Sequence, residues 1–242
     1  NVYVMSVLGV LLCLSGEDGT PLWSVDLVEK FGSTQDIDAT EVAWGRAGSP
    51  LILDDMVIVP AGGPPDKPVS LAAFDKHTGD LKWQGGNTQI SYASPTLATL
   101  AGVQQILSVN ESNITSHDPE TGKVLWQADW PGDSSANATA SQPHAVGDDR
   151  VLLSKGYSVG AKMLKVMKSD DAWATEVDWE SMRVMRTKYT NAAVVDGYAY
   201  DLNDGLLECV DLKDGKPAWR GKRYGHGQIL VAGNAVLVMT EN

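Results

Sequence analysis

The sequence is poor in phenylalanine, cysteine and basic residues. Its 242 residues include two Phe and two Cys, against eight Trp and seven Tyr, so aromatic packing must rely on indole and phenol rings. The 19 basic and 31 acidic residues leave a net charge of −12, which is repelled by the phosphates of nucleic acid and by anionic membranes. We therefore expect no nucleic-acid partner.

The chain also lacks a hydrophobic run long enough to cross a membrane, and no stretch shows a sustained helical period with caps. The run at 2–14 (VYVMSVLGVLLCL) resembles a signal peptide, but it is too short for a bilayer span and has no basic n-region. The two cysteines, Cys13 and Cys209, show no metal-binding spacing, so we expect buried thiols. The sequence predicts no transmembrane segment and no metal ligand.

Several of the tryptophans share a local pattern. Four of the eight Trp follow a Gly by four residues, and a polar turn residue stands four residues before each Gly. The sets are Ser15, Gly19 and Trp23; Asp75, Gly79 and Trp83; Asp118, Gly122 and Trp126; and Asp211, Gly215 and Trp219. Because Gly takes positive φ without steric cost, the pattern predicts a hairpin turn that leads into a Trp-bearing strand.

The spacing of these turns indicates an internal repeat. The successive Gly are 60, 43 and 93 residues apart, and the long last interval indicates a degenerate copy near 163–179, with Trp173 or Trp179 in the Trp position. Residues 2–23 align without a gap on 198–219, with seven identities. Part of the 60-residue interval comes from 62–68 (GGPPDKP), which lengthens one hairpin loop.

Each repeat is expected to contain four short antiparallel strands, because alternating apolar segments are separated by turn residues. Repeats of 40 to 50 residues with four strands are typical of the blades of a β-propeller. The predicted fold is therefore all-β. Blades are expected at about 44–88, 91–130, 139–180 and 189–222, and partial blades at 1–30 and 226–242. Each repeated Trp is expected to lie flat against the neighbouring blade.

The motifs at 75–83 (DKHTGDLKW), 118–126 (DPETGKVLW) and 211–219 (DLKDGKPAW) resemble the tryptophan-docking motif of the quinoprotein-like, or PQQ-like repeat, β-propellers. The resemblance covers essentially the whole chain. Such propellers have seven or eight blades, so it implies that 1–242 is an incomplete fragment of a single propeller domain. A closed small propeller of about five blades is the alternative.

The resemblance implies two classes of function. The first is a non-catalytic propeller, similar to the scaffold lipoprotein of the bacterial outer-membrane β-barrel assembly machinery, which binds a protein partner or small ligand in the periplasm or elsewhere outside the cytoplasm. The second is a dehydrogenase that holds pyrroloquinoline quinone and Ca²⁺. Such dehydrogenases typically carry a vicinal disulfide, and this sequence has no adjacent Cys pair. We therefore favour the non-catalytic class and expect no cofactor and no catalytic residues.

Candidate binding residues come from the starts of the innermost strands, which converge on one rim of a propeller. Equivalent positions hold neutral hydrogen-bonding residues, and aromatic or basic residues precede them. The set is Trp44, Arg46, Ser49, Tyr92, Ser94, Gln142, Tyr189, Asn191, His226 and Gln228. These side chains either orient a ligand or satisfy backbone groups at the strand entries. His77 and His117 lie in or beside hairpin turns, so we expect them to be exposed.

Overall fold

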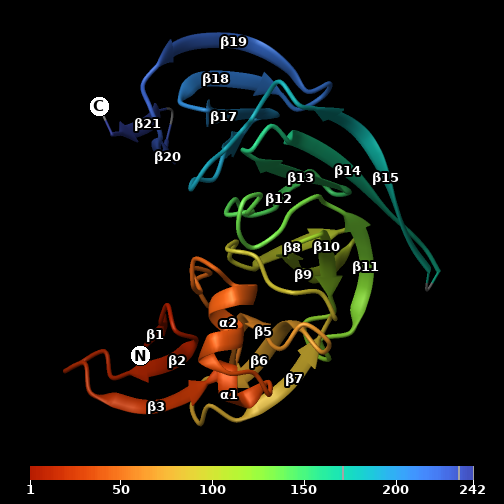
Figure 1. Cartoon of the computed structure of the whole chain (residues 1–242). Helices are drawn as coiled ribbons and strands as arrows, with labels where there is room; N and C mark the ends of the chain where they lie inside the picture. The colour runs from red at the N-terminus through yellow and green to blue at the C-terminus, as the bar shows by residue number, and fades with distance from the viewer. Residues whose placement is uncertain (171, 234, 242) are drawn as a thin grey trace. The chain divides into compact units, whose positions relative to one another are not determined.

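The structure is a computed structural model that describes all residues except 171, 234 and 242. Its strands pair with their neighbours along the chain into antiparallel sheets (Figure 1). The chain divides into two compact units, one made of 1–98 and 104–138, the other of 99–103 and 139–242.

The first unit holds three sheets, with strand orders β1-β2-β3, β4-β5-β6-β7 and β11-β10-β9-β8. The tip of the β8–β9 hairpin belongs to the second unit. The strands are β1 (Val2–Met5), β2 (Val10–Leu14), β3 (Pro21–Asp26), β4 (Leu51–Leu53), β5 (Met56–Gly62), β6 (Val69–Asp75), β7 (Leu81–Gly85), β8 (Thr96–Leu100), β9 (Val103–Val109), β10 (Asn113–His117) and β11 (Val124–Asp129). The run at 2–14 thus forms two strands of a sheet.

The second unit also holds three sheets, with strand orders β12-β13-β14-β15, β16-β17-β18-β19 and β20-β21. The strands are β12 (His144–Val146), β13 (Arg150–Lys155), β14 (Gly160–Ser169), β15 (Ala172–Ser181), β16 (Ala193–Val195), β17 (Tyr198–Asn203), β18 (Leu206–Asp211), β19 (Lys216–Arg223), β20 (Gly227–Ala232) and β21 (Ala235–Thr240). Successive four-stranded antiparallel sheets confirm the predicted all-β blades.

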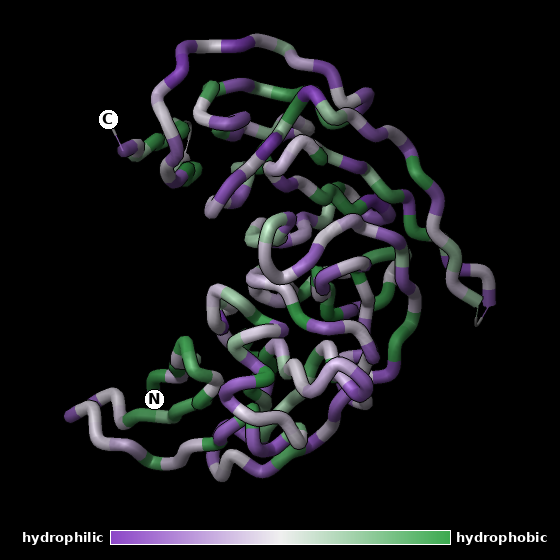
Figure 2. The backbone as a smooth tube through the Cα atoms, viewed as in Figure 1, coloured by the Kyte–Doolittle hydropathy of each residue, from purple (hydrophilic) through white to green (hydrophobic). Residues whose placement is uncertain are grey.

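Apolar side chains from neighbouring sheets form the core between them. In the first unit one cluster joins Leu11 of β2 to Val57 and Phe74 of the next sheet, and another joins Trp83 to Ile106 of the sheet after it. A third cluster connects the sheets β12–β15 and β16–β19 in the second unit. Exposed and half-buried residues alternate along most of β15, as expected of a strand with one packed face, and Figure 2 shows hydrophilic and hydrophobic residues mixed along it.

Two short helices, which the sequence did not predict, follow β3. They are α1 (Leu27–Lys30) and α2 (Gln35–Glu41). The Asp26 side chain caps the first by accepting from two backbone N–H groups, and the Thr34 hydroxyl caps the second. With four and seven residues, the helices are too short to produce a recognisable period of 3.6 residues.

The first residue of each repeated motif shapes the turn. The Asp75 carboxylate accepts from the backbone N–H of His77 and Thr78, and Asp118 does the same for Glu120 and Thr121. The ion pair with Lys82 and these backbone hydrogen bonds lower the pKa of Asp75 to about 2. Each turn thus closes through the side chain of its own first residue.

The Gly and Trp of the motif meet across neighbouring sheets. A Cβ on Gly79 would approach the indole of Trp23 to 2.9 Å, one on Gly122 would approach Trp83 to 2.3 Å, and one on Gly215 would approach Trp179 to 2.5 Å. Each of these glycines has a φ between 68° and 78°. Gly is therefore needed both for the backbone conformation and for the indole of the preceding sheet.

The second residue of the motif contributes its carbonyl to the same contact. The indole N–H of Trp23 donates to Lys76 O at 3.1 Å, that of Trp83 to Pro119 O at 3.0 Å and that of Trp179 to Leu212 O at 3.0 Å. Trp179, not Trp173, therefore fills the Trp position of the degenerate copy.

Two of the repeated tryptophans depart from this pattern. Trp126 is buried, and its indole N–H donates to Gln105 Oε1 of its own sheet at 2.7 Å. Trp219 on β19 is 45% exposed and packs near Tyr200.

Candidate functional site

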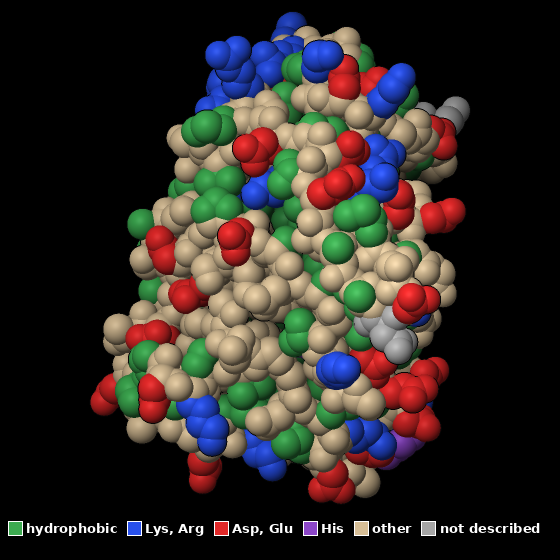
Figure 3. Space-filling view, turned by 90° about the vertical axis from the view of Figure 1, so that its right-hand side faces the viewer, with side chains coloured by type: hydrophobic (Ala, Val, Ile, Leu, Met, Phe, Trp, Pro, Cys, Tyr) green, Lys and Arg blue, Asp and Glu red, His purple; other side chains and the backbone are tan. Residues whose placement is uncertain are grey.

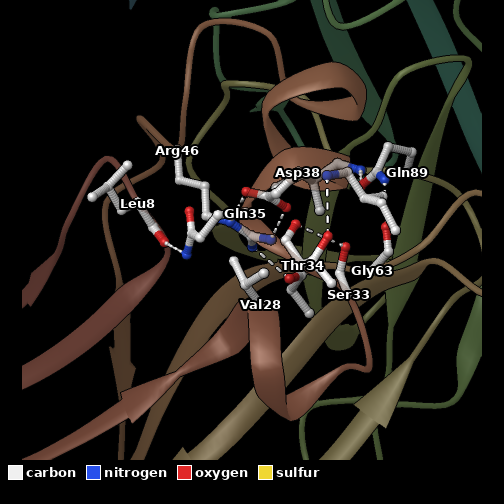
Figure 4. A network of polar contacts seen from close by, with 12 residues as sticks. Leu8, Val28, Ser33, Thr34, Gln35, Asp38, Arg46, Gly63 and Gln89 are labelled. Atoms are coloured by element: carbon white, nitrogen blue, oxygen red, sulfur yellow. Dashed lines mark hydrogen bonds and ion pairs between the residues drawn. The ribbon is translucent and has the colours of Figure 1, made fainter.

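The loop between α2 and β4 carries two of the candidate residues, Trp44 and Arg46, into very different surroundings. Arg46 is buried and forms an ion pair with Asp38 of α2, with Nη2 at 2.6 Å from Oδ1 and Nε at 3.2 Å from Oδ2 (Figure 4). Its Nη1 donates to the carbonyl of Ala61 on β5. The guanidinium therefore joins the helix to the neighbouring sheet.

Glycines make room for this buried side chain. A Cβ on Gly62 would come within 2.7 Å of Arg46 Nη2, and one on Gly9 within 2.9 Å of Nε. The surrounding backbone is fixed by further bonds, since Gln35 donates to Leu8 O and Gln89 donates to Gly63 O (Figure 4). Nε, Nη1 and Nη2 of Arg46 each donate to a protein acceptor, and the side chain thus fixes the position of the loop.

Trp44, two residues away, points into solvent. Its side chain is 72% exposed, yet its indole N–H donates to Ser135 O at 3.0 Å and its backbone N–H donates to the Tyr92 hydroxyl at 3.1 Å. The Tyr92 hydroxyl in turn donates to Ser134 O, and burial raises the pKa of this phenol. Tyr92 is buried and acts as a bridge between the Trp44 loop and the segment after β11.

Three carboxylates of the first unit, those of Glu41, Glu111 and Asp133, interact through their charges. Glu41 ends α2, Glu111 follows β9, and Asp133 lies in the segment after β11. Burial raises the pKa of the Glu111 carboxyl, hydrogen bonds from Ser134 oppose the shift, and the charges of Glu41 and Asp133 add to it. Asp133 Oδ1 accepts from the backbone N–H of Ser135 and Asn137, which shapes the turn that receives the Trp44 indole.

Most other candidate residues hold neighbouring strand entries together. Ser94 Oγ accepts from Ser49 N at 2.8 Å. Asn191 Oδ1 accepts from Gln142 N at 2.7 Å, and its Nδ2 donates to Gln142 Oε1 at 2.9 Å. These contacts correspond to the interpretation in which the polar side chains satisfy backbone groups.

Tyr189, Gln228 and His226 form a second group in the other unit. Gln228 Nε2 donates to Tyr189 O at 2.7 Å, and the rings of Tyr189 and His226 meet edge to face at 6.3 Å between centroids. Tyr189 is 66% exposed and has a φ of 58°, a strained value for a non-glycine residue. The aromatic ring is thus presented to solvent at the entry to β16.

The two turn histidines differ from each other. His77 is exposed, as expected, but the expectation for His117 was wrong, because its ring is fully buried. His117 Nδ1 lies 2.9 Å from Gly122 O and Nε2 lies 2.9 Å from Thr115 Oγ1, and burial lowers its pKa. His117 is the last residue of β10 rather than part of the turn, and every residue of this strand from Ile114 to His117 is buried.

A buried pair of carboxyl groups lies in the second unit. Asp201 of β17 and Glu208 of β18 are cross-strand partners, and both are fully buried. Glu208 accepts from Met185 N and from Arg220 Nε, each at 2.9 Å, whereas Asp201 has no hydrogen-bond partner among the described residues. Burial, together with the charge of Glu208, raises the pKa of Asp201 well above its ordinary value.

Sequence reasoning missed both groups of carboxylates. Asp133 could have been found from its DSSAN turn sequence, and the Asp201–Glu208 pair from their apolar strands. No local signal links Glu111 to Glu41 and Asp133, because only the tertiary structure lets their charges interact. Outside these groups, Lys and Arg side chains gather at the top of Figure 3, where β19 lies; its basic residues are Lys216, Arg220, Lys222 and Arg223.

The described residues include no group of His, Cys, Asp or Glu arranged to hold a metal ion. Cys13 and Cys209 are buried free thiols, as predicted. No helix in the described part of the chain has the length and apolar character needed to cross a membrane.

Residues 1–221 match the family model of the outer membrane protein assembly factor BamB. The chain belongs to this family. It consists of PQQ-like repeats, as the recurring turn and Trp motifs predicted. The chain matches no curated protein sequence.

Solved structures with a similar fold include BamB from Moraxella catarrhalis, at 17% sequence identity and a TM-score of 0.50; the match covers 98% of this chain and 78% of that chain. A europium-containing methanol dehydrogenase has 10% identity and a TM-score of 0.44, with 94% of this chain and 68% of that chain covered. A quinohemoprotein alcohol dehydrogenase from Comamonas testosteroni has 14% identity and a TM-score of 0.42, with 93% and 34% covered. At these identities the likeness concerns the fold alone.

Proposed function

We propose that this chain is a non-catalytic propeller scaffold that presents its loops to a protein partner during the assembly of outer membrane proteins. The match to the BamB family over 1–221 carries the proposal. A scaffold with this role works in the periplasm or otherwise outside the cytoplasm. The partner is a protein rather than nucleic acid, in keeping with the net charge of −12.

The repeated indole contacts support a rigid scaffold. Trp23, Trp83 and Trp179 each join one sheet to the turn of the next, by packing and by a hydrogen bond. We infer that these are the tryptophan-docking contacts of the PQQ-like repeat. Their recurrence stiffens the stack of sheets, so that loops between strands are held in fixed places.

The strand-entry loops support binding of a partner through aromatic side chains. Polar residues such as Ser94 and Asn191 are engaged by the neighbouring entry, whereas Trp44 and Tyr189 are exposed. Large aromatic side chains are enriched in protein interfaces, where they supply contact area at low entropic cost. A protein surface is therefore a better match to these loops than a small polar ligand.

Crosslinking in the bacterium that makes the protein tests the proposal. The tagged chain is isolated after crosslinking, and its partners are identified by mass spectrometry. We expect a component of the outer-membrane assembly machinery. Recovery of cytoplasmic proteins alone would contradict the proposal.

Titration with pyrroloquinoline quinone and Ca²⁺ tests the alternative of a quinone-dependent dehydrogenase. We expect no saturable change in absorbance and no alcohol-dependent dye reduction. Both signals together would replace the scaffold by an enzyme.

A further inference from the structure

We propose that the pocket between the end of α1 and the loop at 62–68 binds the C-terminal carboxylate of a protein segment whose last residue is apolar. The inference rests on the proposed scaffold function and specifies which part of a partner the scaffold holds. The pocket has a volume of about 410 Å³, which is within the range typical of ligand sites, and all its lining residues belong to the first unit.

The loop at 62–68 forms a rigid wall of this pocket. Pro64 O accepts from Lys67 N at 3.0 Å, which closes a turn, and the three prolines of the loop fix their own φ angles. The start of the loop is fixed as well, because the buried Gln89 donates to Gly63 O at 3.0 Å (Figure 4). Lys67 is therefore carried by a preformed turn, which lowers the entropic cost of binding.

The end of α1 forms the opposite wall. Lys30 is the last residue of the helix, and Phe31 follows it as the C-cap, with its backbone N–H donating to Leu27 O at 3.1 Å. Phe31 is half-buried and packs against the apolar cluster that includes Leu27 and Val69. Because Phe31, Val69 and Pro64 also line the pocket, they offer a fixed apolar surface to a ligand side chain.

The first unit is poor in cations, and this pocket collects two that have no ionic partner. Arg46, Lys76 and Lys82 each form an ion pair with an aspartate. Lys30 and Lys67 form no ion pair with any described residue, and both line the pocket. The basic residues of the unit are Lys30, Arg46, Lys67, Lys76, Lys82 and Lys123. The pocket is thus a locally basic place in an acidic protein, which favours an anionic ligand.

A chain terminus matches this lining because it combines a carboxylate, a backbone N–H and a side chain in one residue. The ammonium groups of Lys30 and Lys67 can donate charge-assisted hydrogen bonds to the carboxylate. Asp66 and Gln84 also line the pocket, and their side-chain oxygens can accept from the backbone N–H of the terminal residue. A phosphate group would be repelled by Asp66 and would leave the apolar surface without a partner. The chemistry therefore commits the pocket to a peptide C-terminus.

Calorimetric titration of the purified chain with acetyl-Ala-Ala-Leu, which has a free C-terminal carboxylate, tests the pocket at low ionic strength. The matched peptide with a C-terminal amide has nearly the same shape without the charge. We expect the free acid to bind and the amide to bind at least about tenfold more weakly, since the charge-assisted hydrogen bonds are lost. Equal affinities of the two peptides, or no binding of the free acid at about 1 mM, would overturn the proposal.

A third peptide, acetyl-Ala-Glu-Leu-amide, separates a chain terminus from an acidic side chain. It carries one carboxylate within the peptide and none at its end. We expect it to bind as weakly as the amide, because its carboxylate and its apolar residue are not on the same residue. An affinity equal to that of the free acid would overturn the assignment to a C-terminus.

Substitutions locate the binding on the chain. Lys30→Gln and Lys67→Gln keep much of the length and polarity of these exposed side chains but remove their charge, so the fold persists; together they are expected to weaken the free-acid peptide about tenfold. Lys123→Gln is the matched control, because Lys123 also lacks an ion pair among the described residues and does not line the pocket.

The proposal is overturned if the control lowers the affinity as much as the double substitution of Lys30 and Lys67, or if that double variant binds within twofold of the unmodified chain. Because the assay uses a purified chain and synthetic peptides, its failure leaves the crosslinking result on the scaffold role untouched.

Discussion

Arg46 precedes a strand in the sequence, as the exposed rim candidates do, yet its side chain is buried. Its spacing before β4 matches that of the exposed rim candidates, but Asp38 of α2 draws its guanidinium inward and two glycines leave the space for it. A buried ion pair of this kind is costly to break, because the remaining charge has no partner and no water.

Asp38→Asn is therefore expected to destabilise the first unit by about 3 to 5 kcal/mol. The exposed Asp36 on the same helix provides the control, and Asp36→Asn is expected to cost less than about 1 kcal/mol. Urea unfolding followed by circular dichroism measures both values. Equal losses for the two variants would mean that the Arg46 ion pair contributes little.

Asp201 gives the second unit a distinct pH dependence. Its pKa in the folded chain is raised, so folding favours the protonated carboxyl. This contribution is complete below the unfolded pKa of about 3.9, and it is lost as the pH rises through the folded pKa. Asp201→Asn removes the titration, so the variant is expected to gain stability over the unmodified chain as the pH increases through this window.

Denaturant unfolding at a series of pH values measures this gain. Glu176→Gln, on an exposed strand face, should leave the pH dependence unchanged. A difference between the Asp201 variant and the unmodified chain that stays constant with pH would contradict the assignment.

At the scale of elements, the repeated turn and the Trp strand work as a pair of complementary halves. The turn contributes a Gly and a backbone carbonyl. The indole of Trp23, Trp83 or Trp179 in the preceding sheet packs on the Gly, and its N–H donates to the carbonyl. The motif therefore encodes contacts between sheets as well as the turn itself.

Gly122→Ala tests the packing of the Trp83 indole on the turn glycine. The variant is expected to lose about 3 kcal/mol or more, because the new methyl meets both a positive φ and the ring of Trp83. Gly19 occupies the same motif position with a φ of 75°, and a Cβ there meets nothing within 4 Å among the described residues. Gly19→Ala should therefore cost about 1 kcal/mol, and equal losses in thermal unfolding would show that the indole contact is irrelevant.

Trp83→Ala tests the contribution of the indole to the same contact between sheets. Removal of a buried indole is expected to cost about 3 to 5 kcal/mol, through lost burial and the cavity that remains. Trp219 holds the same motif position but is half-exposed, so Trp219→Ala should cost about 1 kcal/mol. Chemical unfolding compares the two, and a loss below about 1 kcal/mol for Trp83→Ala would show that this ring is not packed between sheets.

The sequence predicted these elements well where the deciding chemistry is local. A polar turn residue, a Gly and a Trp at fixed spacing identify each hairpin, because the side chain of Asp75 or Asp118 caps a turn that it belongs to. Helix α2 escaped prediction because it is short and is stabilised by Arg46, beyond its own last residue. The charge interaction of Glu111 with Glu41 and Asp133 escaped prediction because the three residues are far apart from one another in the sequence.

At the scale of the whole molecule, the net charge of −12 produces a negative electrostatic field around the protein. Such a field accelerates the approach of a basic partner and is screened within about 8 Å at physiological ionic strength. The proposed scaffold function gives this field a role, because a scaffold must meet its partner before its loops can bind it.

The association rate of a basic protein partner is therefore expected to fall about tenfold between low and high salt. Stopped-flow mixing of the chain with a partner identified by crosslinking measures the rate. A rate that does not change with salt would show that the net charge does not assist the encounter.

The indole contact also has a direction, which gives the stack of sheets a polarity. Trp23, Trp83 and Trp179 each reach forward along the chain to the turn of the next sheet. Trp83 of β7, for example, contacts the turn before β11, so damage at that turn releases the sheet that precedes it. Hydrogen exchange in Gly122→Ala should accordingly quicken in β7 before it does in β11. Within the first unit, loosening at a turn thus spreads to the preceding sheet, that is, toward the N-terminus.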